Sequence, residues 1–252
     1  MTPVPPPPPA APSGAAALFG DRLPHAERFV ALLADTGVGH GLIGPREVPR
    51  LWERHVLNCA VIADAFPEGS TVIDVGSGAG LPGLALAIVR PDLVVHLVEP
   101  MHRRTAWLAE ATAVLDLDRV TVHRGRAEEL AGLLRGPFVT ARAVARLGSL
   151  ARWCRPLLED DGLLVAMKGS SAATELEQDH DALVALGMVH AEIREHGAGL
   201  VDPPTVTVCL TFAGAVESRS DPTRPRRDGA GGLDGRRQRG RRPRGSGSAH
   251  RR

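Results

Sequence analysis

The sequence contains no tyrosine, and aromatic residues of all kinds make up only 3% of its 252 residues. Its three cysteines are scattered and form no C-x-x-C pair, which argues against both a disulfide framework and a zinc site. No apolar run is long enough to cross a membrane, and the first residues lack the layout of a signal peptide. We therefore expect a cytoplasmic protein with reduced thiols, no bound metal and no membrane partner.

Basic residues are unevenly chosen and unevenly placed. Lys168 is the only lysine, and the other 29 basic residues are arginines. The lysine either meets a need for a compact ammonium group or survives by chance. Residues 219–252 contain twelve arginines and three aspartates, a net charge of +9, so −8 remains for the rest of a chain whose total is +1. A mildly acidic body thus carries a basic tail, which should add salt-sensitive, sequence-independent affinity for RNA.

Composition divides the chain into three parts. Residues 1–19 are rich in proline and alanine and are expected to be extended or disordered. Residues 20–213 have the hydrophobic periodicity of a folded domain, with a helical cap over 20–68 and a core over 69–213. Residues 214–252 are rich in Gly, Ser, Pro and Arg and are expected to be a disordered tail. We expect the folded domain to act as a monomer.

Strand and helix patterns alternate through the core, which predicts an α/β fold with a mostly parallel, seven-stranded sheet covered on both faces. Strands are expected at 71–75, 93–98, 119–123, 137–141, 162–167, about 188–194 and 204–212, and helices at 82–90, 101–115, 127–134, 147–156 and 173–186. The last two strands follow each other without a helix and should form an antiparallel pair. Before the core, helical spacing over 25–34 and again from Pro45 to Ile62 predicts the two helices of the cap.

The stretch from Thr71 to Gly83, T-V-I-D-V-G-S-G-A-G-L-P-G, predicts a strand, a tight glycine loop and the start of a helix. Gly76, Gly78 and Gly80 allow the backbone to turn and to approach a ligand without interference from a Cβ atom. Such a loop in front of a helix is typical of nucleotide-binding sites.

Two nucleotides fit this loop to different degrees. Gly78, Gly80 and Gly83 match G-x-G-x-x-G, and Glu99 lies 21 residues beyond Gly78, the spacing of a dinucleotide site. Asp74 precedes the first glycine, however, and a carboxylate there would repel a pyrophosphate but favour the sulfonium and ammonium groups of S-adenosylmethionine (SAM). The pattern therefore favours a class I SAM-dependent methyltransferase over an NAD enzyme. A glycine turn without a ligand is the third interpretation.

Several side chains that could serve such a site are predicted at the carboxyl ends of strands, where ligands of open α/β sheets bind. Glu99 could accept the ribose hydroxyls or cap the following helix. Arg142 could bind the SAM carboxylate or an RNA phosphate, or form a surface salt bridge. Lys168 ends the next strand at the same rim. Ala127 and Glu128 could meet the adenine edge, unless this segment is a solvated charge cluster.

Three arginines are candidates for RNA contacts. Arg103 and Arg104 begin the helix after Glu99, where their charge opposes the helix dipole, so either phosphate contact or a solvated face would explain them. Arg126 follows the third strand. His55 falls on the apolar side of a cap helix and is interpreted as a core histidine. The sequence offers no Ser-His-Asp set and no N-x-x-[YF] motif of adenine-N6 methyltransferases.

Together these motifs resemble one family. V-I-D-V-G-S-G-A-G-L-P-G-L-A-L-A-I-V-R-P-D, followed by E-P-M-H-R-R, G-R-A-E-E, A-R-A and M-K-G, resembles the ribosomal RNA guanine-N7 methyltransferases of the glucose-inhibited division protein B family. G-L-I-G-P-R-E-V-P-R-L-W-E-R-H-V-L-N is similar to the N-terminal helices of the actinobacterial members. The resemblance covers roughly residues 22–213. The cap departs from the wider family in having H-G-L-I-G where many members have N-L-T.

The resemblance implies a class I fold and methylation at N7 of the guanine at position 527 of 16S rRNA, either free or in the small ribosomal subunit. It implies that SAM is bound at Gly76, Leu81, Ala127, Glu128 and Arg142, with Glu99 on the ribose. Guanine N7 has a free lone pair, so catalysis should come mainly from positioning. Arg142 or Lys168 could orient the base through guanine O6. A methyltransferase with another substrate and an RNA-binding protein without activity remain open.

Overall fold

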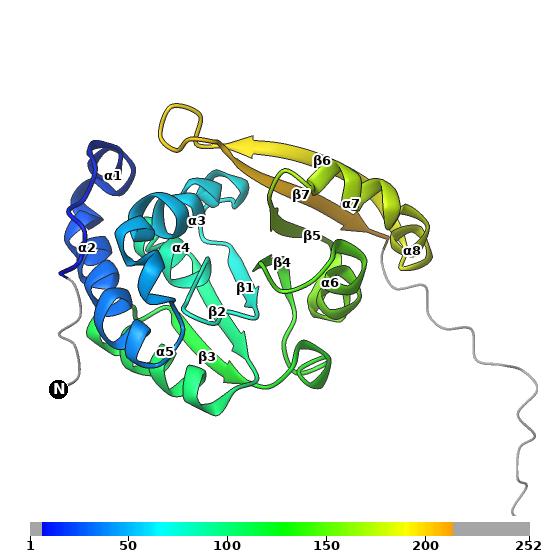
Figure 1. Cartoon of the computed structure of the whole chain (residues 1–252). Helices are drawn as coiled ribbons and strands as arrows, with labels where there is room; N and C mark the ends of the chain where they lie inside the picture. Colours follow the sequence, from blue (N-terminus) through cyan, green and yellow to red (C-terminus); the bar gives the residue numbers. More distant parts are fainter. Residues whose placement is uncertain (1–6, 214–252) are drawn as a thin grey trace, which may run out of the picture. The chain divides into compact units, whose positions relative to one another are not determined.

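Seven strands form one sheet in the computed structural model, which describes residues 7–213 (Figure 1). They are β1 (Thr71–Val75), β2 (Val94–Glu99), β3 (Val120–Arg124), β4 (Gly136–Arg142), β5 (Leu158–Lys168), β6 (Met188–His196) and β7 (Thr205–Phe212). Their order across the sheet is β3-β2-β1-β4-β5-β7-β6. As predicted, β6 and β7 form an antiparallel pair; β7 is also antiparallel to β5, and the other pairs are parallel. The strand order reverses between β1 and β4, where open α/β sheets bind their ligands.

The helices that follow β1 agree only in part with the prediction. They are α4 (Gly83–Val89), α5 (His102–Val114), η6 (Ala127–Glu129), α6 (Leu147–Cys154), η7 (Arg155–Leu157), α7 (Ala172–Gln178) and α8 (His180–Ala185). The helix expected over 127–134 is wrong beyond the short turn η6, because the chain bends at Gly132, whose φ is +82°. The helix expected over 173–186 is interrupted at Asp179. Among residues 7–213, no helix is long and apolar enough to span a membrane.

The segment before the sheet is helical but irregular. It comprises α1 (Ser13–Phe19), η1 (Gly20–Arg22), α2 (Leu23–Leu32), η2 (Leu33–Gly37), η3 (Pro45–Arg50), η4 (Leu51–Leu57), α3 (Asn58–Ala60) and η5 (Val61–Ala65). The first predicted cap helix is present as α2. The second is not a regular α-helix, since η3 and η5 are 3-10 helices and η4 is a π-helix. Pro49 lies inside η3, and a proline removes one backbone donor from a helix.

The expectation that residues 1–19 are extended or disordered is wrong for the segment 13–19. Ser13–Phe19 form α1, whose Phe19 ring is buried edge-on against Trp52. The Trp52 indole N–H also donates a hydrogen bond to the carbonyl of Pro9 at 2.9 Å. Three consecutive alanines in α1 have high helix propensity, and the helix contributes buried apolar area to the cap. The predicted tail at 214–252 lies outside the described residues.

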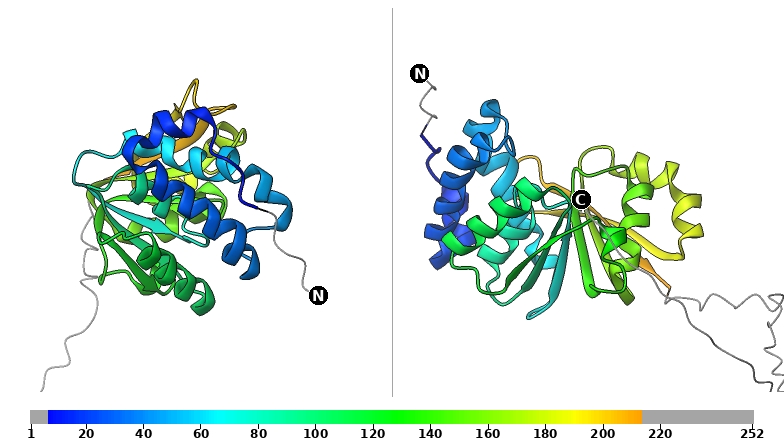
Figure 2. Two further views of the ribbon diagram at one scale, coloured as in Figure 1. Left: turned by 90° about the vertical axis from the view of Figure 1, so that its left-hand side faces the viewer. Right: turned by 90° about the horizontal axis from the view of Figure 1, so that it is seen from below.

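Apolar side chains form one core on each face of the sheet, so the sheet is the middle of three layers (Figure 2). Helices α1 to α5 and the other cap helices pack against one face, which includes Val72 of β1. Helices α6 to α8 pack against the other face, which includes Ile73 and Val75. Because side chains alternate along a strand, Asp74 lies on the same face as Val72. Its carboxylate is therefore enclosed between β1 and α4.

Candidate functional site

The glycine loop after β1 is held against the end of β2. The Gly76 N–H donates to the carbonyl of Val98 at 2.8 Å. Gly76, Gly78 and Gly80 have φ values of +74°, +53° and +77°, which strain any residue with a Cβ atom. A Cβ atom added at Gly80 would lie 2.4 Å from a buried leucine side chain, whereas one at Gly78 would meet its nearest atom at 3.7 Å. The loop is therefore tightly packed underneath and open at Gly78, where a ligand can approach the backbone.

Glu99 closes this loop from the end of β2. Its side chain is buried, and its two oxygens accept the N–H groups of Gly78 at 3.1 Å and Met101 at 3.0 Å. The Arg104 guanidinium lies 3.6 Å away. Glu99 thus caps α5, as one of the two predicted roles proposes, and also fixes the glycine loop. Each carboxylate oxygen retains capacity for a further donor, so a ribose hydroxyl remains compatible with both contacts.

Asp74 is fully buried beneath the loop. Its Oδ2 accepts the Gly83 N–H at 3.0 Å, but its Oδ1 has no hydrogen-bond partner among residues 7–213. Burial raises the pKa of this carboxyl to about 7, and the Gly83 hydrogen bond offsets the effect only in part. A buried polar atom without a partner costs free energy. A cationic group bound nearby would therefore be stabilised, and the carboxyl would ionise more readily.

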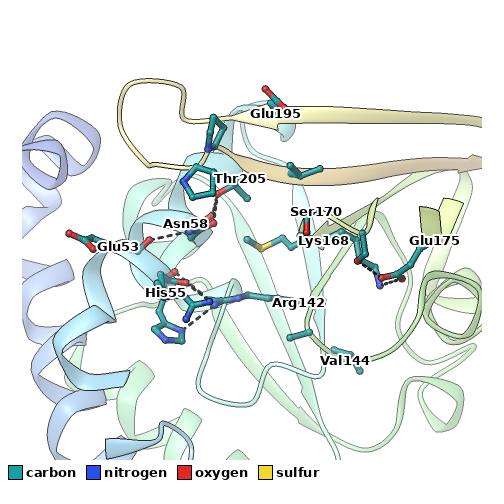
Figure 3. A pocket seen from close by; sticks show the side chains of 18 of the residues that line it. Glu53, His55, Asn58, Arg142, Val144, Lys168, Ser170, Glu175, Glu195 and Thr205 are labelled. Carbon is teal, nitrogen blue, oxygen red and sulfur yellow. Dashed lines mark hydrogen bonds and ion pairs between the residues drawn. The ribbon is translucent and has the colours of Figure 1, made fainter. Parts of the chain in front are cut away.

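A cleft of about 1120 Å³ lies beside the glycine loop (Figure 3). Its walls are the cap, the ends of β4 and β5, and the connection between β6 and β7. Its ionisable lining consists of the cations Arg50, Arg54, Arg142, Arg146 and Lys168, the carboxylates Glu47, Glu53, Glu175, Glu195 and Asp202, and His55. Because the two signs balance, the interior suits a neutral group with polar edges better than a polyanion.

Val144 separates the cleft from the glycine loop. It lines the cleft, and a Cβ atom added at Gly76 would lie 2.8 Å from its Cγ2. The preceding residue, Ala143, has a φ of +53°, a strained value for a residue with a side chain. The cleft and the glycine loop therefore lie on either side of the Val144 side chain. Sequence reasoning missed Val144 because a valine has no chemical signature, and its place depends on the turn after β4.

Lys168 is largely buried, and its ammonium is hydrogen-bonded to two neighbours. Its ammonium donates to the carbonyl of Ala145 at 2.7 Å and to Glu175 at 2.8 Å. Glu175, which sequence reasoning also missed, accepts the Leu147 N–H at 3.0 Å through the same oxygen. The charge of Lys168 is thus matched, and its contacts fix the turn that carries Val144.

Arg142 reaches from the end of β4 to the cap. Its Nη2 donates to the carbonyl of Arg54 at 2.8 Å and lies 3.1 Å from Nδ1 of His55, and its Nη1 donates to Sγ of Cys59 at 3.1 Å. The alternative of a surface salt bridge is wrong, since no carboxylate pairs with Arg142 within residues 7–213. Its positive charge therefore stays uncompensated at the cleft wall.

The other candidate residues lie around the carboxyl edge of β2 and β3. Arg103 donates to the carbonyl of His40 in the cap, which gives it a structural reason to begin α5. Arg126 and Glu128 are exposed, while Ala127 is buried. The structure thus brings together the predicted residues of the first two strands, and it turns Arg142 away from them toward the cap.

Comparison with known proteins gives one consistent result. Residues 22–201 match the GidB family, described as rRNA small subunit methyltransferase G. A Ribosomal RNA small subunit methyltransferase G from Thermobifida fusca is 52% identical over 91% of this chain and 97% of its own length. The protein of the same name from Salinispora tropica is 54% identical over 85% of this chain and 90% of its own.

Solved structures agree on the fold at much lower identity. A putative S-adenosyl-L-methionine-dependent methyltransferase from Methanococcus maripaludis has a TM-score of 0.50 and 12% identity, covering 75% of this chain and 93% of its own. An M. jannaschii protein in complex with AdoMet has a TM-score of 0.50 and 16% identity, covering 66% of this chain and 78% of its own. With a matching family over most of the sheet and relatives above 50% identity, the chain belongs to the GidB family of rRNA small subunit methyltransferases.

Proposed function

We propose that the protein is a SAM-dependent methyltransferase that modifies N7 of the guanine at position 527 of 16S rRNA. The observation that carries the proposal is the unpartnered Oδ1 of Asp74, buried beneath an open glycine loop and next to a cleft large enough for a nucleoside. Family membership supports the substrate class, and the AdoMet held by a protein of the same fold supports the cofactor.

The glycine loop and its surroundings fit SAM in charge and in shape. Asp74 would favour its cationic groups, and the backbone at Gly76, Gly78, Gly80 and Leu81 would border it. Glu99 would accept ribose hydroxyls, and Ala127 and Glu128 lie where the adenine edge would be bound. Bound SAM supplies an electrophilic methyl group. The residues of this chain must then hold the acceptor atom in line with that group and keep water out.

Arg142 is the better of the two candidate cations for catalysis. Lys168 is matched by Glu175 at 2.8 Å, whereas Arg142 contacts only neutral acceptors. A guanidinium at the cleft wall can orient guanine through its O6 atom and stabilise charge there. Guanine N7 carries a lone pair at neutral pH, so the residues of the cleft need not include a general base.

RNA contacts are proposed for a wider surface. Arg103, Arg104 and Arg126 lie around the edge of the sheet where the glycine loop is found, and the arginines of residues 219–252 would add nonspecific attraction. The proposed partner is 16S rRNA, free or in the small subunit, and the proposed compartment is the cytoplasm. The proposed folded domain covers residues 20–213, with a helical cap over 20–68 and a SAM-binding core over 69–213, and acts as a monomer.

Mass spectrometry of 16S rRNA from a strain lacking this gene tests the proposal directly. The wild-type chain should restore one methyl group on the guanine at position 527. Arg142→Ala should restore it poorly, with methyl transfer reduced about 100-fold or more in vitro, because a positioned cation at the reacting base is lost. Arg152→Ala, on the exposed side of α6, is the matched control. An unmethylated guanine after complementation with the wild-type chain would refute the assignment.

A further inference from the structure

His55 lies between two charged residues from different parts of the chain. It belongs to η4, and its side chain is only 15% exposed. Its Nδ1 lies 3.1 Å from Nη2 of Arg142, at the end of β4, and its Nε2 lies 2.9 Å from Oε2 of Glu47. Figure 3 shows the imidazole directly beside the Arg142 guanidinium at the cleft wall. The three side chains thus form a chain of contacts, Glu47–His55–Arg142.

The chemistry of arginine fixes the tautomer of this histidine. A guanidinium has only donors, so Nδ1 of His55 must accept the hydrogen bond from Arg142. The imidazole is therefore neutral, and its single N–H is on Nε2, where it donates to the carboxylate of Glu47. Glu47 orients the ring, in the way that a carboxylate orients a histidine in many active sites. The sequence-based interpretation of His55 as a core histidine accounts for its burial but not for this polarity.

Arg142 uses its terminal nitrogens entirely on the cap. Besides His55 Nδ1, its acceptors are the carbonyls of Arg54 and His55, at 2.8 and 3.5 Å, and the thiol of Cys59 at 3.1 Å. The imidazole is the only one of these acceptors that a proton would turn into a donor near neutral pH. Within residues 7–213 no acceptor is found for the Arg142 Nε–H, which leaves this donor available to a ligand.

We propose that His55 is a positioning residue that acts through Arg142: oriented by Glu47 and kept in its Nε2-protonated neutral form, it holds the guanidinium in place for methyl transfer. This inference rests on the proposed role of Arg142. It adds that residues of the cap hold the Arg142 guanidinium in position. A proton on Nδ1 of His55 would break the hydrogen bond between the two side chains, because both would then be donors.

The surroundings of His55 keep it neutral at neutral pH. Burial lowers the pKa of the imidazole; the hydrogen bond to Glu47 raises it, and the charges of Arg142 and Arg54 lower it, with a net decrease. These three groups, Glu47 and Arg54 from the cap and Arg142 from β4, are the charged neighbours of the ring. At saturating SAM, protonation of His55 should therefore lower kcat only below the ordinary histidine pKa of about 6.5.

Three substitutions at one position separate the two contacts. His55→Asn keeps an acceptor close to the position of Nδ1, His55→Gln keeps a donor close to the position of Nε2, and His55→Ala keeps neither. We expect kcat/KM to fall about tenfold in His55→Ala and His55→Gln, the effect of losing one oriented hydrogen bond. His55→Asn should recover most of this loss and, at saturating SAM, should lack the fall in kcat that protonation of His55 causes. His180→Ala, exposed on α8, is the matched control.

A double-mutant cycle distinguishes positioning from a structural effect. If His55 acts through Arg142, His55→Ala should cause no further loss of kcat/KM in the Arg142→Ala background. Loss by the same factor in both backgrounds, or a His55→Asn enzyme as impaired as His55→Ala, would overturn the inference. Thermal unfolding of each variant shows whether the fold survives.

A measurement without turnover keeps this test separate from the proposed function. Nitrogen chemical shifts of His55 in the full-length wild-type chain at pH 7 report the tautomer, and the inference requires the proton on Nε2. A proton on Nδ1 overturns it whatever the activity is. Wild-type turnover by Arg142→Ala would instead reject the catalytic role of Arg142, and with it the mechanism by which His55 acts.

Discussion

Replacement of Asp74 by asparagine should remove the effect of pH on stability at this position. In the folded chain the pKa of Asp74 is raised from 3.8 to about 7 by burial. Between these values the folded state binds more protons than the unfolded state, so its stability falls as pH rises. The full interval corresponds to about 4 kcal/mol, of which about 3 kcal/mol falls between pH 5 and pH 9. Asparagine does not titrate, so Asp74→Asn should gain about that much on the wild-type protein across this range.

Urea unfolding followed by tryptophan fluorescence at pH 5, 7 and 9 measures this difference. The amide of the variant adds a buried donor, whose cost is independent of pH, so only the change with pH is diagnostic. Asp92→Asn is a control whose difference from the wild type should stay constant from pH 5 to pH 9, because the Arg90 guanidinium holds the pKa of Asp92 below its usual range. Its stabilising contribution is present above pH 4 and is lost as pH falls. An Asp74→Asn difference that stays constant from pH 5 to pH 9 would refute the account of Asp74.

Three further predictions concern the ligand, the loop and the ion pair. SAM should bind more tightly at pH 8 than at pH 6, because its cationic groups favour the ionised form of Asp74. Calorimetry in buffers of different ionisation enthalpy should detect the proton that Asp74 releases on binding. Equal affinity at both pH values would contradict this prediction. Gly80→Ala should weaken SAM binding and destabilise the fold by about 1–3 kcal/mol, because the added Cβ would lie 2.4 Å from Leu84. The control is Gly132→Ala: Gly132 has a similar φ, but its added Cβ meets no atom within 4 Å, so this variant should suffer only the backbone strain. Lys168→Met should destabilise the chain by about 3 kcal/mol in thermal or urea unfolding, because Glu175 would lose its partner. Adding Glu175→Gln to the same chain should restore part of the lost stability. A further loss of stability in the double variant would show that the two residues act separately.

Patterns that depend on strands were predictable from the sequence. Each expected strand is present, because short apolar or alternating segments bounded by turn residues have few alternatives in an α/β chain. The glycine loop was also predictable, because Gly76 and Gly80 have positive φ values that other residues avoid. Two helices were less predictable. Asp179 divides one, and Gly132 ends another.

The site itself was only half predictable. Asp74 and Glu99 lie next to the loop in sequence or at a fixed distance beyond it, so their positions at the loop follow from spacing. Arg142 was identified as a cleft cation, but its partners come from the cap, some 85 residues away, and spacing carries no information on such contacts. Glu175 and Val144 were missed for the same reason. Contacts between distant elements are decided by packing, which a local pattern does not encode.

The walls of the cleft come from the two ends of the folded region. Cap residues such as Asn58 and Asp64 bond to Thr205 and His196 of the last two strands, while the glycine loop lies between them in the chain. During synthesis the cap, the loop and the neighbouring strands emerge before β7, and the cleft cannot form until β7 has left the ribosome. A nascent or truncated chain would therefore have the means to hold a nucleotide but no enclosed place for a second substrate. For an enzyme proposed to act on ribosomal RNA, made within reach of that RNA, this order of assembly delays activity until translation of the domain is complete.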